Sequence, residues 1–220
     1  YNNPIAQCHL GFLYFSNEMI PKNSQKAFYY ILLSARSNYV RAFHLLGFIY
    51  YTGEIVKKDI EKSIFYFTKA ADMNYMKSQF SLAQIYDVGR DVPRNINKSI
   101  HYYSLVAEQN DVESQFILGE IYNQDSELPR SIDKAIYYYS LADKQNHPEA
   151  QLNLGKIYYI DKKELDKAFY YFTKAAKQGI AESHHYLGVM YYNGEHVEKN
   201  IDKAISHFLI ASNEQIDESA

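Results

Sequence analysis

The chain has 220 residues, of which 47% are hydrophobic and 22% charged, a composition typical of a folded protein and not of a disordered one. Its net charge of -3 and the absence of a basic cluster argue against nucleic acid or an anionic membrane surface as partner. Its one cysteine, Cys8, excludes an internal disulfide, and no run of about 18 apolar residues predicts a transmembrane helix.

A five-residue pattern, Leu-Gly-x-Ile-Tyr in its commonest form, recurs along the chain. Its second position is held by Gly11, Gly47, Ala83, Gly119, Gly155 and Gly188. Successive copies are 36 residues apart, except that the last lies 33 residues after its predecessor. Such a fixed period is the signature of a repeat protein. A second pattern follows each first one and begins at Lys26, Lys62, Lys98, Lys134, Lys167 and Lys203.

In chain order, we expect each repeat to form two helices joined by a turn. Apolar or small residues in both patterns are spaced three and four apart, as on one face of an amphipathic helix. The small residue in the middle of each first helix predicts a close approach of a neighbouring helix, since a glycine there costs about 1 kcal/mol relative to alanine. The predicted repeats are residues 3–38, 39–74, 75–110, 111–146, 147–179 and 180–213.

Residues at the expected helix ends agree with this division. Good N-cap residues precede the second helices at Asp59, Asn95, Ser131 and Asn200. Proline stands in the first turn of two first helices, at Pro4 and Pro148. Left-handed C-caps are expected at Gly53, Gly89 and Gly194. The turns contain Pro21, Pro93 and Pro129. Tyrosine recurs in the first helices and again in the second, at Tyr30, Tyr66, Tyr102, Tyr138 and Tyr170.

The sequence resembles the Sel1-like repeat family, a relative of the tetratricopeptide repeats. The second repeat matches the family pattern at Ala42, Leu46, Gly47, Tyr50, Gly53, Val56, Asp59, Lys62, Tyr66, Ala70 and Ala71. The resemblance covers nearly the whole chain. The departures are Asn17 and Asp125 in place of the turn glycine, Ala83 in place of the helix glycine, and a turn in the fifth repeat that is three residues shorter. It implies an all-α fold, an α-solenoid of six helix-turn-helix repeats in a right-handed superhelix with the first helices on its concave face, and adaptor or scaffold work.

On this arrangement, positions −6, −3, +1 and +4 relative to the Leu-Gly glycine should face the concave side. The −6 row changes from basic to acidic between Lys77 and Glu113. The +1 and +4 rows carry aromatic residues near both ends of the repeat array. The residues that we expect to bind a partner are Phe12, Phe15, Arg41, His44, Phe48, Tyr51, Lys77, Phe80, Glu113, Glu149, Tyr159, Glu182 and Tyr192. Alternatively, Phe12 and Phe15 pack against a preceding segment, because the end of a repeat array normally needs a cap.

No motif in the sequence predicts catalysis, a cofactor or a metal site. His184 and His185 are adjacent, so on a helix they diverge by about 100° and would not share one metal ion. Phosphate-loop and nucleophile-elbow motifs do not occur. Cys8 lies at a −3 position, where it is either accessible or a small packing residue.

The sequence therefore predicts a non-enzymatic scaffold that binds a protein or peptide, without cofactors, nucleic acid or membrane insertion. Two alternatives stay open: a structural component packed into a larger complex, and the regulatory repeat region of a multidomain enzyme such as a kinase. The chain starts at Tyr1 and not at Met, so we expect it to be part of a longer protein. The lone cysteine favours a cytoplasmic location.

Overall fold

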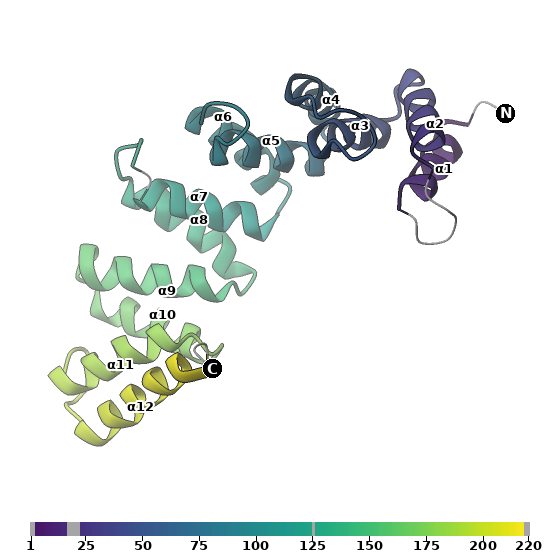
Figure 1. Cartoon of the computed structure of the whole chain (residues 1–220). Helices are drawn as coiled ribbons and strands as arrows, with labels where there is room; N and C mark the ends of the chain where they lie inside the picture. Colours follow the sequence, from purple (N-terminus) through teal and green to yellow (C-terminus); the bar gives the residue numbers. More distant parts are fainter. Residues whose placement is uncertain (1–2, 17–22, 125, 218–220) are drawn as a thin grey trace. The chain divides into compact units, whose positions relative to one another are not determined.

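The computed structural model describes residues 3–16, 23–124 and 126–217, with side chains described up to residue 212. All regular structure in these ranges is helical (Figure 1). The chain divides into two compact units, Tyr1–Gln109 and Asn110–Ala220, here called unit one and unit two. The turn positions Asn17, Pro21 and Asp125 lie outside the described residues.

Each of the six predicted repeats forms a pair of packed helices, as the two sequence patterns predict. Unit one contains α1 (Pro4–Ser16), α2 (Ser24–Arg36), α3 (Val40–Thr52), α4 (Ile60–Asp72), α5 (Met76–Val88) and α6 (Ile96–Ala107). Unit two contains α7 (Val112–Gln124), α8 (Ile132–Lys144), α9 (Pro148–Lys156), η1 (Ile157–Lys162), α10 (Leu165–Ala176), α11 (Ala181–Asn193) and α12 (Ile201–Asp217). Odd-numbered helices are the first helices of the repeats.

The glycine of the first helix lies against a second-helix side chain. A Cβ atom built on Gly47 would stand 2.5 Å from the ring of Phe67, and one on Gly119 would stand 2.4 Å from the ring of Tyr139. Both rings are buried. The close approach predicted from the recurring small residue is therefore confirmed, and it has a specific cause: the ring occupies the place that a methyl group would take.

Near the turn of each helix pair, an aromatic ring of the first helix stacks on one of the second helix, and a lysine lies over the first ring. In the second repeat the rings of Tyr50 and Tyr66 stack at 5.7 Å, and the ammonium group of Lys62 lies 5.4 Å from the Tyr50 ring. Equivalent tyrosine pairs are Tyr14–Tyr30, Tyr86–Tyr102, Tyr122–Tyr138 and Tyr158–Tyr171. The recurring lysine that starts the second pattern thus has a structural role as a cation over an aromatic face.

In the fifth repeat the stacked residue is Tyr171, so the expectation that Tyr170 continues the tyrosine row is wrong by one residue. Tyr170 is exposed and lies edge-on to Tyr171. The reason is the three-residue deletion in this repeat. It places the second helix 33 residues after the second helix of the preceding repeat in place of 36, so the stacked tyrosine is Tyr171.

The deletion is absorbed by the backbone of the first helix. After Lys156 the chain continues as the π-helix η1, and Lys163 then adopts a left-handed φ of 58°. Elsewhere Gly53, Gly89 and Gly194 take that conformation, as predicted. Wider π turns and a non-glycine left-handed residue therefore replace the normal turn.

The second helices start at the predicted caps. The side chains of Asp59, Asn95 and Asn200 accept hydrogen bonds from backbone N–H groups three residues later, whereas Ser131 makes no such side-chain bond. The N–H group of each of these cap residues also donates to the carbonyl of the repeat's first-helix tyrosine, as Asp59 does to Tyr50 at 2.9 Å. The turn is therefore fixed at both ends.

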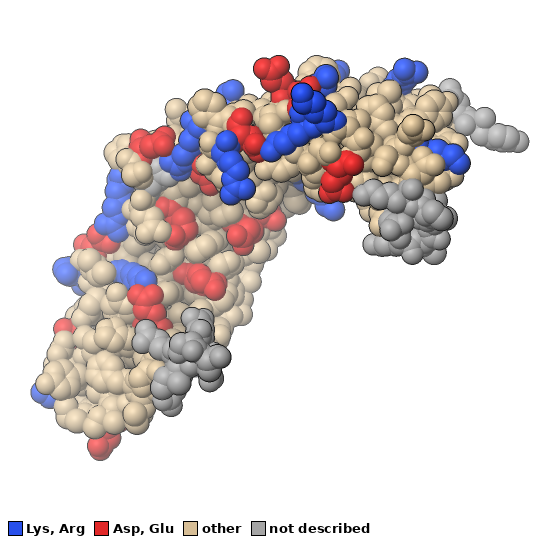
Figure 2. All heavy atoms as spheres, in the orientation of Figure 1, with Lys and Arg blue, Asp and Glu red and all other residues tan. Residues whose placement is uncertain are grey.

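Charged side chains of both signs are interspersed on the surface shown in Figure 2. Several ion pairs join neighbouring repeats within a unit. Lys58 pairs with Asp91 at 2.7 Å in unit one, and Arg130 pairs with Asp161 at 2.7 Å in unit two. These pairs are partly exposed, so each contributes little stability on its own.

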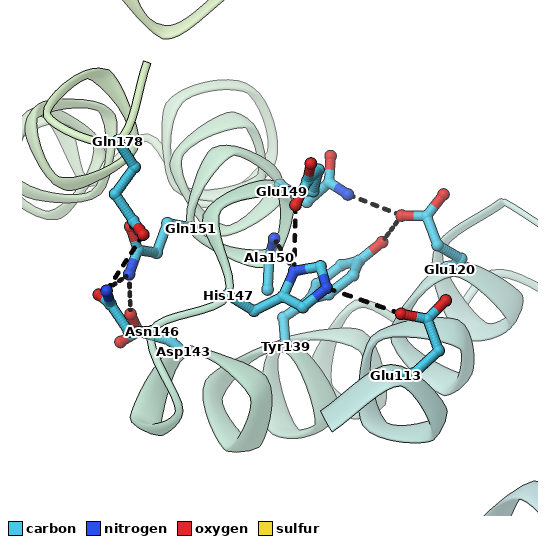
Figure 3. Close-up of polar contacts among 11 residues, drawn as sticks. Glu113, Glu120, Tyr139, Asp143, Asn146, His147, Glu149, Ala150, Gln151 and Gln178 are labelled. Carbon is cyan, nitrogen blue, oxygen red and sulfur yellow. Dashed lines mark hydrogen bonds and ion pairs between the residues drawn. The ribbon is translucent and has the colours of Figure 1, made fainter. Parts of the chain in front are cut away.

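Buried glutamines connect successive repeats. Gln151 at the start of α9 donates to the side chain of Asn146, at 3.1 Å, and accepts from Gln178, at 2.7 Å (Figure 3). Asn146 ends the preceding repeat in a left-handed conformation. Gln79 makes the same two contacts in unit one, with Asn74 and Gln109. A polar group this buried is stable only when its hydrogen bonds are satisfied, so these bonds specify the register between repeats.

We predict that Gly119→Ala destabilises the protein although alanine favours helix formation. The added methyl group would overlap the Tyr139 ring, and overpacking of this kind costs about 1–3 kcal/mol. The matched control is Ala83→Gly, at the equivalent position of the third repeat. It should cost about 1 kcal/mol through helix propensity, to which the loss of a fully buried methyl group adds, but it introduces no overlap with a ring. Urea unfolding followed by circular dichroism measures both, and a Gly119→Ala variant as stable as the wild type would contradict the packing argument.

Candidate functional site

In unit one, the first-helix residues of the first two repeats touch one another. Phe15 lies edge-on to Phe48 with ring centroids 6.1 Å apart. The guanidinium group of Arg41 lies 5.9 Å from the Phe12 ring centroid and 3.5 Å from the Nε2 atom of His9. The structure therefore brings together four of the predicted contact residues, in a surface that mixes aromatic rings with a positive charge.

A cleft opens between α3 and α5, which we call the α3/α5 cleft. It consists of two adjoining hollows of about 220 and 150 Å³ that share Tyr51, Gln84 and Ile85. Its apolar walls also include Phe48 and Val88, which are 38% and 63% exposed. Large apolar side chains this exposed beside a hollow are typical of interface anchors.

One end of the α3/α5 cleft is charged. Asp91 and Arg90 line the larger hollow. The ammonium group of Lys58 lies 2.7 Å from the Asp91 carboxylate and 5.3 Å from the Tyr51 ring centroid. Lys58 therefore links the Asp91 carboxylate to the face of the Tyr51 ring. The cleft thus combines an apolar floor with a polar end. This arrangement suits the binding of an apolar side chain that lies next to a polar group of the same ligand.

Two predicted contact residues in unit one are engaged in packing. The His44 ring lies between the rings of Phe67 and Tyr75, with centroids 5.4 and 5.2 Å away, and its Nδ1 is 2.9 Å from the Ser78 hydroxyl. Burial, with the nearby charges of Lys77 and Arg41, lowers the pKa of His44 to about 4. Phe80 lies edge-on to the buried Tyr103. Lys77, by contrast, is exposed.

In unit two, exposed carboxylates flank a partly buried histidine. Glu113 and Glu149 approach opposite nitrogen atoms of His147, at 4.0 Å from Nε2 and 3.3 Å from Nδ1 (Figure 3). The His147 ring stacks on Phe116 at 4.6 Å, and its Nδ1 also accepts the backbone N–H of Ala150, so it caps α9. The imidazole is thereby fixed, while both glutamates remain exposed.

A third carboxylate, Glu120, is held by donors from two helices. Its Oε1 accepts hydrogen bonds from the Tyr139 hydroxyl and, at 2.6 Å, from Asn153 (Figure 3). Burial, reinforced by this carboxylate, raises the pKa of Tyr139 far above its usual value, so the hydroxyl remains a donor. Glu120 is therefore a structural acceptor as well as part of the acidic surface.

The last two repeats continue this surface with paired charges. Glu182 lies 2.7 Å from the Lys156 ammonium group, and the Tyr159 hydroxyl donates to Glu195 at 2.7 Å. Burial and the Glu195 carboxylate raise the pKa of Tyr159 to about 12. Tyr192 is 54% exposed. We call Glu113, Glu149 and Glu182, the exposed carboxylates of these first helices, the acidic face of unit two.

Some parts of the site are not visible in the sequence pattern. Val88, Arg90 and Asp91 line the α3/α5 cleft but stand at a helix end and in a turn, outside the four rows used for prediction. The signal available in the sequence was an apolar residue, Val88, directly before the expected C-cap Gly89. Cys8 is fully buried, which resolves its two alternatives in favour of a packing residue and shows that the −3 row is not uniformly accessible.

Among the described residues, no cluster of three or more histidine, cysteine or acidic side chains could hold a metal ion. None of the described helices is both long enough and apolar enough to cross a lipid bilayer.

Comparison with known proteins identifies the repeat. The family model for the Sel1 repeat matches residues 4–39, 40–75, 77–111, 112–147, 148–180 and 181–215. No curated protein matches the sequence. Among solved structures, c5321, a protective antigen of uropathogenic Escherichia coli displaying an SLR fold, aligns with a TM-score of 0.78 at 24% identity. That alignment covers 97% of this chain but only 46% of c5321, so this chain spans less than half of that protein.

A Sel1 repeat protein from Oxalobacter formigenes aligns with a TM-score of 0.65 at 26% identity, covering 96% of this chain and 88% of that protein. These likenesses support the all-α repeat fold. They say nothing about a particular partner or binding surface.

We predict that His44 makes stability depend on pH. Its folded pKa of about 4 lies below the ordinary value of 6.5, so between these values the unfolded chain takes up a proton that the folded chain does not. Stability is therefore fully present above pH 6.5 and falls as the pH drops towards 4, by up to about 1.4 kcal/mol per pH unit. Urea midpoints at pH 7 and 5 should lie closer together in His44→Gln than in the wild type, and the difference that remains comes from other groups such as His207, whose pKa burial also lowers. Exposed His101→Gln should keep the wild-type dependence, and a His44→Gln variant that also keeps it in full would contradict the assignment.

Proposed function

The chain belongs to the Sel1 repeat family, and we propose from this premise that it is a non-catalytic scaffold that recruits a peptide or partner protein through its first-helix surfaces. Sel1 repeats typically form scaffolds for protein–protein interaction. Because a solenoid fold does not dictate function, the proposal needs a surface suited to binding. The α3/α5 cleft is the observation that supports it most.

The size and composition of the α3/α5 cleft suit one inserted side chain. Its hollows of about 220 and 150 Å³ are smaller than most small-molecule sites, which span about 300–1,000 Å³. Phe48, Tyr51 and Val88 surround an apolar floor, and a few desolvated anchors usually dominate the binding energy of an interface. We infer that an apolar or aromatic side chain of the partner inserts here.

The acidic face of unit two favours a partner segment with basic residues. Glu113 and Glu149 are exposed on successive first helices, and His147 between them is fixed by its contacts with Phe116 and Ala150. Electrostatic complementarity of this kind mainly increases the association rate and the specificity. The two surfaces are proposed independently, each within its own unit.

We predict that Phe48→Ala combined with Tyr51→Ala weakens binding of partner peptides by about tenfold or more, or about 1.4 kcal/mol. The peptides come from a random library selected on the wild-type chain, and fluorescence polarisation gives their affinities. The matched control is Phe65→Ala, which removes an even more exposed phenylalanine from α4. It should change the affinity by less than about twofold, because α4 is a second helix.

Folding must be monitored in the same variants. Phe48→Ala should cost only about 0.5 kcal/mol of stability, as at other exposed sites, and Tyr51→Ala somewhat more, because the Tyr51 ring is partly buried against Phe67 and Ile85. Leu118→Ala, which empties a fully buried position, should cost about 2–5 kcal/mol. If the cleft substitutions unfold the chain as Leu118→Ala does, or if Phe65→Ala weakens binding equally, the assigned surface is wrong.

We predict that Glu113→Gln combined with Glu149→Gln weakens the binding of basic peptides that bind to the acidic face of unit two. Most of the loss of affinity should be in the association rate. The loss should shrink as ionic strength rises, because salt screens exposed charges. Stopped-flow measurements at low and high salt test this. The control Asp133→Asn removes an exposed carboxylate from the second helix α8 and should leave the rate unchanged. Equal effects of the two changes would mean that only net charge matters.

A further inference from the structure

We propose that a pocket between α10, α11 and α12 binds an apolar organic anion, meaning a carboxylate attached to a hydrophobic body. The pocket has a volume of about 410 Å³ and lies wholly among described residues of unit two. This is within the range of small-molecule sites, about 300–1,000 Å³. It does not involve the α3/α5 cleft or the acidic face, so it stands apart from the scaffold function proposed above.

Two histidines from different helices meet in this pocket. Their Nδ1 atoms, in His184 of α11 and His207 of α12, are 2.8 Å apart, a hydrogen-bond distance. His207 also stacks on the Tyr191 ring at 5.7 Å. His184 therefore faces a partner on the next helix, whereas the adjacent His185 contacts Phe208. When both imidazoles are neutral, one proton lies between the Nδ1 atoms, and one Nε2–H remains as a donor.

Both histidines are specific to the sixth repeat. Position 207 is occupied in the five preceding repeats by the second tyrosine of the stack, for example Tyr171. Position 184 corresponds to Gln151, which joins repeats through its amide. A histidine side chain is shorter than a tyrosine side chain, so His207 leaves space where every other repeat has a phenol. His207 thus keeps the stack on Tyr191 but does not fill the space that the longer phenol side chain takes in the other repeats.

The remaining lining determines the charge and polarity of the ligand. Phe169, Leu187 and Ala176 supply apolar walls, and Lys177 lines the pocket from the end of α10. Lys203 lies 5.0 Å from the Tyr191 ring and so adds a second cation nearby. None of the described residues that line the pocket is an aspartate or a glutamate. The Lys177 ammonium group in the lining, the Lys203 ammonium group nearby and the one imidazole N–H donor would disfavour a metal cation and favour a carboxylate, while the apolar walls require a hydrophobic body.

The test uses 3-phenylpropionate and its uncharged amide, titrated into the isotope-labelled chain and followed by NMR. The acid should bind and shift signals of Phe169, Leu187 and Tyr191, and the amide should bind at least about tenfold more weakly. A short peptide ending in a free phenylalanine carboxylate and its amidated form complete the series. Tighter binding of the free peptide would identify a protein C-terminus as the source, and tighter binding of the small acid would identify a metabolite.

Variants that carry the residues of other repeats at these positions are expected to fold, so they test binding separately from folding. H207Y and H184Q introduce the side chains found in the fifth repeat, and each should weaken binding of the acid by at least about tenfold. K177Q should weaken the acid but not the amide. The matched controls are K144Q, the equivalent lysine of α8, and H185Q, the adjacent histidine; both should bind within about twofold of the wild type. Binding of acid and amide alike, unchanged binding in H207Y, or no binding at about 10 mM acid would overturn the proposal.

Discussion

Each repeat depends on how closely its two helices can approach. The ring of a second-helix residue lies directly over the first-helix glycine, so that a methyl group at Gly119 would come within 2.4 Å of Tyr139. The first repeat uses Ile31 against Gly11 in the same way. Because a buried aromatic ring contributes a large apolar area, the loss of helix propensity at the glycine is offset by the packing that it allows. The tyrosine stack and the capped turn then fix the helix pair where the first helix passes into the second.

Most of the recurring side chains of the repeat are engaged in contacts within the fold. The tyrosines, the recurring lysines and the buried glutamines all have partners within the fold. On the first helices, the positions that these contacts leave exposed carry different residues from one repeat to the next. Phe48 and Val88 border a cleft in unit one, whereas Glu113 and Glu149 form an acidic surface in unit two. A constant framework with variable exposed positions is the arrangement expected of a recognition scaffold.

The sequence predicted the framework well and the site only in part. The period, the caps at Asp59 and Asn95, and the close approach at Gly47 follow from local rules of helix geometry. The placement of Tyr170 failed because a deletion changes the register of everything after it. Spacing within one helix also cannot show what a side chain meets on another. This is why the burial of Cys8, the packing of His44 and the contact between His184 and His207 required the structure.

The most direct test of the scaffold account is hydrogen–deuterium exchange of the chain with and without a peptide selected on it. Binding in the α3/α5 cleft should slow exchange at the C-terminal ends of α3 and α5, because the inserted side chain would hinder local opening of these helix ends. The second helices α4 and α6 should exchange at their unbound rates. Protection confined to α4 and α6, with none in α3 and α5, would contradict the claim that first-helix surfaces recruit the partner.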